Sequence, residues 1–263
     1  MTTRFSPALQ NFIAAKGSWK NFMDNGSLEI YTGAMPATPN LAPTGTLLAT
    51  FTSGGAAKTD EVCSQGTLTL NSGGSGSVNT LTVNGLEVMG SQTNFNTSLT
   101  QTAADIALKC NRNPKNYLFH VTSSGAVITF TALPGMGTLP NGWVVAATYT
   151  TIAGTPVNMG TTTAGVSAAN GLLIDYNPVA GLITKDASQT WSGTVVGAGT
   201  QTAGWFRYKS SVVDAGALDS SAVFLRMDGD IATSGATLNM FSTSLTNGQV
   251  RTLDTFSITV PAA

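Results

Sequence analysis

The chain has 263 residues, of which only 10% are charged, against roughly 25% in an ordinary soluble domain. Its 12 lysines and arginines nearly balance its 13 aspartates and glutamates and form no cluster, so we expect no binding to nucleic acid or to an anionic membrane. Hydrophobic residues make up 42% of the chain, enough for a folded core, and no apolar run approaches the roughly 20 residues of a transmembrane helix.

The first predicted element is a short helix near the N-terminus. Ser6 is a favoured N-cap, Pro7 a favoured first helical residue, and Gly17 a typical helix end. The opening sequence has no apolar signal core followed by a cleavage site, so Sec export is not expected. The surrounding segment is too apolar for a free arm, and we predict that it docks on a neighbouring subunit, with packing against its own domain as the alternative. The candidate interface residues are Phe5, Leu9, Phe12, Ile13, Trp19 and Phe22.

Short strands separated by turn residues follow along most of the chain. Alternation of apolar and polar residues, bounded by Gly, Pro, Asn, Asp or Ser, predicts half-buried strands and a mostly β fold, a sandwich or a barrel. Outside the central region the strands are expected at 28–32, 47–52, 205–209, 223–227 and 256–260. The sequence Asp228-Gly229-Asp230 resembles a fragment of an acidic metal loop, but we interpret it as a turn between strands.

A central block has a different pattern. Residues 72–77 are all serine or glycine, a composition that predicts a flexible linker. Beyond it, Asn84-Gly85 indicates a type I′ hairpin turn, and a helix is expected to begin near Thr102 and to stop before Pro114. The strands of this block are expected at 80–83, 86–89, 117–122, 127–131 and 143–150.

The order of these elements, ββαβββ, predicts a small α+β domain at 75–152. The two flanks resemble each other in their alternating strands, and neither is long enough to form a stable sandwich alone. We therefore predict that 1–70 and 154–263 form one β-sandwich, which carries the N-terminal helix and holds the α+β domain as an insertion in a loop.

Few residues have the pattern of a catalytic or cofactor site. The single histidine, His120, lies within a predicted strand, and no G-x-S-x-G sequence is present. Cys63 and Cys110 lack metal-ligand spacing and are predicted to be free, partly buried thiols in a reducing compartment. The glycine pair at 197 and 199 lacks the third glycine of a dinucleotide site. We therefore predict no catalytic residue, no metal and no cofactor.

The tryptophans allow a binding function. A tryptophan at the end of a strand is most often part of a core or a subunit interface. In a carbohydrate-binding sandwich, such a ring would instead stack on a sugar. The candidate ligand-stacking aromatic residues are Trp191 and Trp205.

Several segments resemble a known group of proteins. The segments 4–6, 26–33 and 45–50 resemble the start of many tailed-bacteriophage virion structural proteins, and 202–207 with 226–229 resemble their ending. The central block is similar to a small domain repeated in phage structural proteins. The resemblance implies a virion component and brings no catalytic residue with it.

The sequence thus predicts a non-enzymatic virion protein, made in the host bacterial cytoplasm. Capsid decoration (cement) or a minor capsid role is the first expectation. The expected partners are other virion proteins (major capsid or tail proteins) and copies of the chain itself. Binding to nucleic acid or to a membrane is not expected. The alternatives are a tail or fibre subunit and an adsorption module that binds a host glycan. A third is a virion glycosidase that uses carboxylates such as Asp175, Asp186, Asp214 and Asp228.

Overall fold

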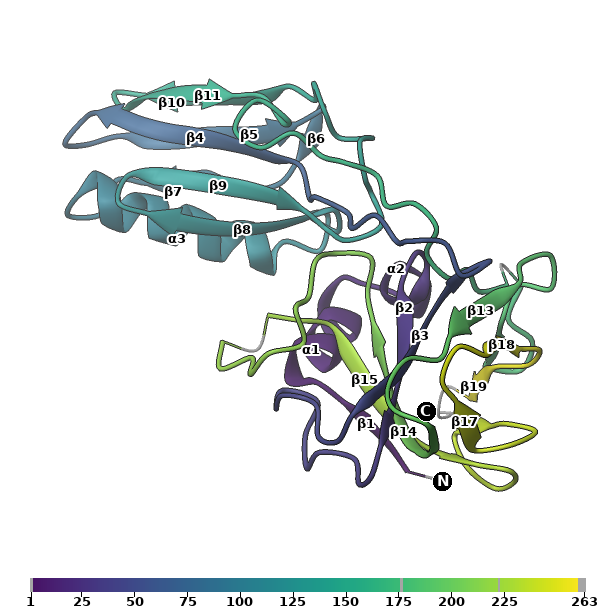
Figure 1. The fold of residues 1–263 in the computed structure, drawn as a ribbon. Helices are drawn as coiled ribbons and strands as arrows, with labels where there is room; N and C mark the ends of the chain where they lie inside the picture. The colour runs from purple at the N-terminus through teal and green to yellow at the C-terminus, as the bar shows by residue number, and fades with distance from the viewer. Residues whose placement is uncertain (1, 176, 222, 260–263) are drawn as a thin grey trace. The chain divides into compact units, whose positions relative to one another are not determined.

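The computed structural model describes residues 2–175, 177–221 and 223–259 (Figure 1). The chain divides into two compact units: unit 1 is Met1–Asp60 with Ala168–Ala263, and unit 2 is Glu61–Ser167. Strands hold 41% of the chain and helices 11%, which confirms the predicted mostly β class. None of the helices in the described residues is both long enough and apolar enough to cross a membrane.

Unit 1 contains one large sheet built from both flanks of the chain. The main strand order is β1-β15-β14-β2-β3-β13-β18, so strands from before unit 2 pair directly with strands from after it. In Figure 1, the purple N-terminal strand β1 runs beside the yellow-green β15. These strands are β1 Thr3–Phe5, β2 Ser27–Thr32, β3 Leu47–Ser53, β13 Trp191–Thr194, β14 Thr200–Lys209, β15 Arg226–Ala232 and β18 Val250–Leu253.

Shorter strands complete unit 1. β16 pairs with β15 in parallel, β17 pairs with β14, and β12 and β19 form a two-stranded sheet of their own. Their bounds are β12 Leu182–Thr184, β16 Leu238–Asn239, β17 Ser244–Thr246 and β19 Ser257–Thr259. The predicted strand at 256–260 therefore corresponds to β19, and Val260 lies outside the described residues.

Two corrections concern β15. The strand begins at Arg226, three residues later than predicted, and it contains Asp228-Gly229-Asp230, which the sequence analysis assigned to a turn. The physical reason is that Gly229 lies against the ring of Phe206, where an added Cβ would come within 2.4 Å of that ring. The glycine here allows close packing within a strand and does not mark a turn.

The N-terminal helix is confirmed, and it packs on its own unit. In α1 (Pro7–Ala15), Ser6 is the N-cap and its side chain accepts a hydrogen bond from the amide of Leu9. A second helix that was not predicted, α2 (Trp19–Met23), follows. Leu9 and Phe22 are fully buried in the core of unit 1, so these two are core residues and not interface residues. The other four candidates are partly buried and pack against the same core: Phe5, Phe12, Ile13 and Trp19.

Unit 2 is the α+β unit. Its strands form two sheets, ordered β10-β5-β6 with β7 beside β5, and β11-β4-β9-β8. Helix α3 (Leu99–Arg112) buries Ile106 and Cys110 in the core that also holds Phe119 and Phe130. The strands are β4 Gln65–Ser72, β5 Ser77–Val83, β6 Leu86–Glu87, β7 Thr93–Asn94, β8 Phe119–Ser124, β9 Val127–Ala132, β10 Val145–Thr150 and β11 Ala153–Val157.

The boundaries of the insertion are wider than the predicted 75–152. β4 pairs with β9, and β11 pairs with β4, so residues 65–72 and 153–157 belong to unit 2 and not to the sandwich. The predicted linker is a tight connection between β4 and β5. Gly76 has a φ of +96°, and an added Cβ would lie 1.9 Å from the carbonyl oxygen of Thr150. Glycine and serine are typical both of flexible linkers and of such turns, so composition alone does not distinguish the two, and the linker prediction was wrong.

Two local predictions in unit 2 can be compared directly. Asn84 and Gly85 both have positive φ, +50° and +79°, between β5 and β6, which confirms the hairpin turn. Helix α3 begins earlier than predicted, because Ser98 is its N-cap and accepts a hydrogen bond from the amide of Gln101. Thr102 lies inside the helix, where its hydroxyl donates to the carbonyl of Ser98.

Candidate functional site: the charged face of unit 1

The large sheet of unit 1 has one apolar face and one charged face. Side chains alternate between the faces of a strand, and directly paired residues share a face. Phe206 and Tyr208 therefore lie in the core with Leu28 and Met227, while Arg207 lies opposite, with its neighbours Glu29 and Asp228. We call the following residues the charged face: Arg4, Ser27, Glu29, Tyr31, Thr50, Thr52, Trp205, Arg207, Lys209, Arg226, Asp228 and Asp230.

Arg207 joins the charged face to the loop between β2 and β3, residues 33–46. Its Nε and Nη2 donate to the two carboxylate oxygens of Asp228, each at 2.8 Å, and both side chains are completely buried. Its remaining Nη1 donates to the carbonyl of Leu41 at 3.0 Å. A guanidinium is suited to this task because its fork of donors matches a carboxylate and leaves a further donor free.

Arg226 connects two loops at once. It donates to both carboxylate oxygens of Asp214 at 2.6 Å and to the carbonyl of Ala217 at 2.9 Å, both in the loop 210–225 between β14 and β15. Its Nη1 donates to the carbonyl of Pro39 in the β2–β3 loop at 3.1 Å. Arg4 donates to the carbonyl of Pro36 in the same loop. The three arginines therefore hold the β2–β3 loop and the β14–β15 loop in fixed conformations over the sheet.

The pKa values of Asp228 and Asp230 on the charged face, and of Asp214 in the β14–β15 loop, reflect these contacts. Burial alone would raise the pKa of Asp214, but hydrogen bonds from Arg226 and the amide of Gly216, together with the charges of Arg226 and Lys209, lower the pKa below its usual value. Burial would also raise the pKa of Asp230, but hydrogen bonds from the hydroxyl and the amide of Thr237 lower it to about 2. For Asp228, burial dominates and raises the pKa, against the pull of the hydrogen bonds from Arg207.

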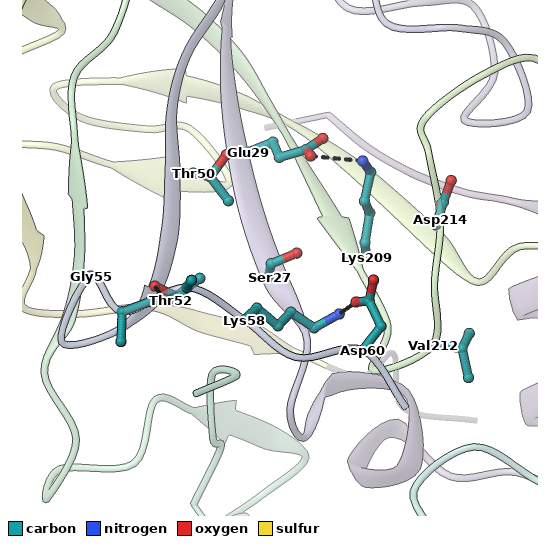
Figure 2. A pocket seen from close by; sticks show the side chains of 12 residues that line it. Ser27, Glu29, Thr50, Thr52, Gly55, Lys58, Asp60, Lys209, Val212 and Asp214 are labelled. Atoms are coloured by element: carbon teal, nitrogen blue, oxygen red, sulfur yellow. Dashed lines mark hydrogen bonds and ion pairs between the residues drawn. The ribbon is translucent and has the colours of Figure 1, made fainter. Parts of the chain in front are cut away.

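A pocket of about 330 Å³ lies at one end of the charged face (Figure 2). In Figure 2, two ion pairs border the same space: Lys209 with Glu29 at 2.7 Å, and Lys58 with Asp60 at 2.5 Å. Apart from the apolar Val212, its remaining lining is polar or small: Ser27, Thr50, Thr52, Gly55, Ala56, Ala57 and Asp214. This pocket is the strongest candidate for a ligand site in the described part of unit 1.

The two tryptophans expected to stack on a ligand are both completely buried. Trp205 stacks on Tyr31 with ring centroids 4.6 Å apart. Trp191 packs against Phe256 in the core at a centroid distance of 5.3 Å. The prediction that either ring forms a ligand platform is therefore wrong, because no face of either ring is accessible to a sugar.

The carboxylates considered for a glycosidase are not brought together as an acid and a nucleophile. Asp175 and Asp186 each accept a hydrogen bond from the backbone amide two residues later, which is typical of turns. Asp214 has a lowered pKa and is bound by Arg226, so it is a poor proton donor. Asp228 has a raised pKa, as a general acid needs, but its side chain has no exposed surface.

The remaining candidate groups lie apart from the pocket. His120 is exposed on β8 of unit 2. Cys63 and Cys110 are free, and Cys110 is fully buried. Burial, with the charge of Glu61 as a smaller cause, raises the pKa of Cys63 to about 12, which makes it a weak nucleophile. Within the described residues, no group of three or more His, Cys, Asp or Glu side chains is arranged to hold a metal ion.

Sequence reasoning missed the charged face as a unit. Its signal was present, because Arg226, Asp228 and Asp230 alternate with Met227 and Ile231, as in a strand with two different faces. The two loops that cover it also carry exposed apolar side chains on their outer sides. These are Leu41, Val213, Leu218 and Val223, which are 41%, 65%, 60% and 63% exposed.

No protein-family model matches the chain, and no curated protein matches its sequence.

Proposed function

We propose that the chain is a non-enzymatic structural protein of a tailed-bacteriophage particle, in which it serves as a capsid decoration or minor capsid component. Its partners are other virion proteins, with further copies of itself beside it. The observation that carries the proposal is that Arg4, Arg207 and Arg226 are occupied in holding two long loops in place. Charged side chains used in this way shape a surface and leave few groups for chemistry.

Fixed loops suit attachment to a repeated surface. A loop that is already ordered loses little conformational entropy on binding, and exposed apolar side chains supply the area that becomes buried. The β2–β3 and β14–β15 loops combine both properties, with Leu41 on the first and Val213, Leu218 and Val223 on the second. We therefore assign particle attachment to these two loops of unit 1.

The test is co-sedimentation of the purified chain with particles that lack it. The double variant Val213→Asp with Leu218→Asp places two charges on exposed positions, so the fold should persist while the bound fraction falls at least about tenfold. The matched control is Val179→Asp with Phe241→Asp, two apolar positions of unit 1 that lie outside these loops and are even more exposed. An equal loss in both double variants, or no loss in the first, contradicts the assignment.

A further inference from the structure

The buried ammonium group of Lys209 has one hydrogen-bond acceptor, Glu29, among the described residues. Lys209 is only 7% exposed and lines the pocket, and in the described part of the chain its ammonium group donates to Glu29 alone, at 2.7 Å. Lys58 also lines the pocket, and its ammonium group has three acceptors: Asp60 and the carbonyls of Ser210 and Ser211. An ammonium group has three donors, so Lys209 has two left for a group inside the pocket.

Hydroxyl groups extend this set of unused donors and acceptors. Ser27 and Thr50 lie on the same face as Glu29, and within the described residues neither hydroxyl has a hydrogen-bond partner. Figure 2 shows Ser27 and Thr50 beside Glu29 at the pocket. Such a mixture of donors and acceptors matches a ligand that can both donate and accept hydrogen bonds, as hydroxyl groups do.

The charges of the pocket balance. Lys58 and Lys209 oppose Glu29 and Asp60, and the third carboxylate, Asp214, is paired with Arg226, which lies outside the lining. A ligand with a full charge would therefore meet no net opposite charge here. The volume of about 330 Å³ is at the small end of ligand pockets and fits one sugar ring.

We propose that this pocket binds a neutral polyhydroxyl ligand, one sugar residue of a saccharide, with Lys209, Glu29, Ser27 and Thr50 as its hydrogen-bonding groups. The site differs from the tryptophan platform expected from the sequence, because no aromatic side chain lines it. It does not rest on the proposed attachment to a virus particle. Without a stacking ring, the dissociation constant should lie in the millimolar range.

The experiment is an NMR titration of the full chain with separate neutral probes: glucose, galactose, mannose and N-acetylglucosamine. At least one probe should saturate and shift the amide signals of residues 55–58, which form one wall of the pocket. Inorganic phosphate and acetate, added at the same concentrations, should bind more weakly than that sugar.

Two variants remove only the unused hydroxyl groups. Thr50→Val and Ser27→Ala break no side-chain hydrogen bond among the residues that the structure describes, and each should weaken sugar binding about fivefold. Thr122→Val is the matched control, because Thr122 is an exposed strand residue of unit 2, and it should bind as the unchanged chain does.

Three results would overturn the proposal. The first is the absence of saturable shifts with every neutral sugar at concentrations up to about 50 mM, well above the expected millimolar constant. The second is sugar binding that Thr50→Val and Ser27→Ala leave unchanged, which would move the site elsewhere. The third is tighter binding of phosphate or acetate than of any neutral sugar.

Discussion

At the scale of single residues, the main feature of unit 1 is a set of charges buried on one face of a sheet. A buried ion pair contributes little when compared with well-packed apolar residues, but losing one partner leaves an uncompensated charge. The pair Arg207–Asp228 is the clearest case, since both side chains are completely buried. Its first role is therefore to fix one arrangement of sheet and loop, and stability depends on both partners being present.

Replacement of Arg207 by methionine should lower the free energy of unfolding of unit 1 by about 3–5 kcal/mol, because Asp228 is then buried without its partner. Urea unfolding followed by tryptophan fluorescence measures this, since Trp19, Trp191 and Trp205 all lie in unit 1. The control Arg251→Met removes a half-buried arginine whose side chain, among the described residues, donates only to the carbonyl of Ser244, and it should cost less than about 1 kcal/mol. Equal effects of the two variants would contradict the role given to the buried pair.

Asp230 predicts how stability changes in acid. Its folded-state pKa of about 2 lies below the usual 3.8, so folding favours the ionised form. The stability that it contributes is fully present above about pH 4 and is lost as the pH falls toward 2. An NMR titration of the Asp230 carboxyl carbon should give a midpoint near 2. A midpoint at or above the usual value of 3.8 would show that the bonds from Thr237 do not hold the ionised form.

At the scale of elements, the sequence predicts best where a local signal decides the structure. Ser6 and Pro7 define the start of α1, and Asn84-Gly85 defines the β5–β6 turn, because cap and turn geometry depend on those residues alone. α2 was missed because five residues carry too little periodicity. The pocket could not be predicted, because Glu29 and Lys209 meet only through pairing of β2 with β14, 180 residues apart in the chain.

The N-cap of α1 has more partners than an ordinary cap, which gives an element-scale prediction. Besides accepting from Leu9, the buried hydroxyl of Ser6 accepts from the amide of Arg226 at 3.2 Å and donates to the carbonyl of Phe224 at 2.9 Å. Ser6→Ala should therefore destabilise unit 1 by about 2–3 kcal/mol. The same change at Ser18, the exposed cap of α2, should cost about 0.5–1 kcal/mol, as measured by urea unfolding. Similar costs at both caps would show that the hydrogen bonds of Ser6 to Phe224 and Arg226 add nothing to the stability of unit 1.

At the scale of the whole molecule, the chain is one split unit that carries another in a loop. Each unit closes its own ends with hydrogen bonds. Thr59 and Ala169 exchange two backbone hydrogen bonds at 3.0 and 3.1 Å in unit 1, and Val62 and Val166 do the same in unit 2. Ends that are held together in this way are typical of domain insertions.

Each unit should therefore fold without the other. A fragment of residues 61–167 should give a cooperative thermal transition and dispersed amide signals. A deletion variant in which Asn-Gly joins residue 60 to residue 168 should keep the unfolding midpoint of unit 1, because the bridge between Thr59 and Ala169 already positions the ends. An unfolded fragment, or a deletion variant that loses its cooperative transition, would contradict the independence of the units.

The most direct test of the proposed function is gold labelling of purified phage particles with an antibody raised against residues 61–167, together with mass spectrometry of the same particles. The account predicts the chain among the virion proteins and label over the head surface. Label confined to the neck or tail would assign it instead to a tail or fibre position. If intact and disrupted particles both lack label and the chain is absent from their mass spectra, the structural role is contradicted.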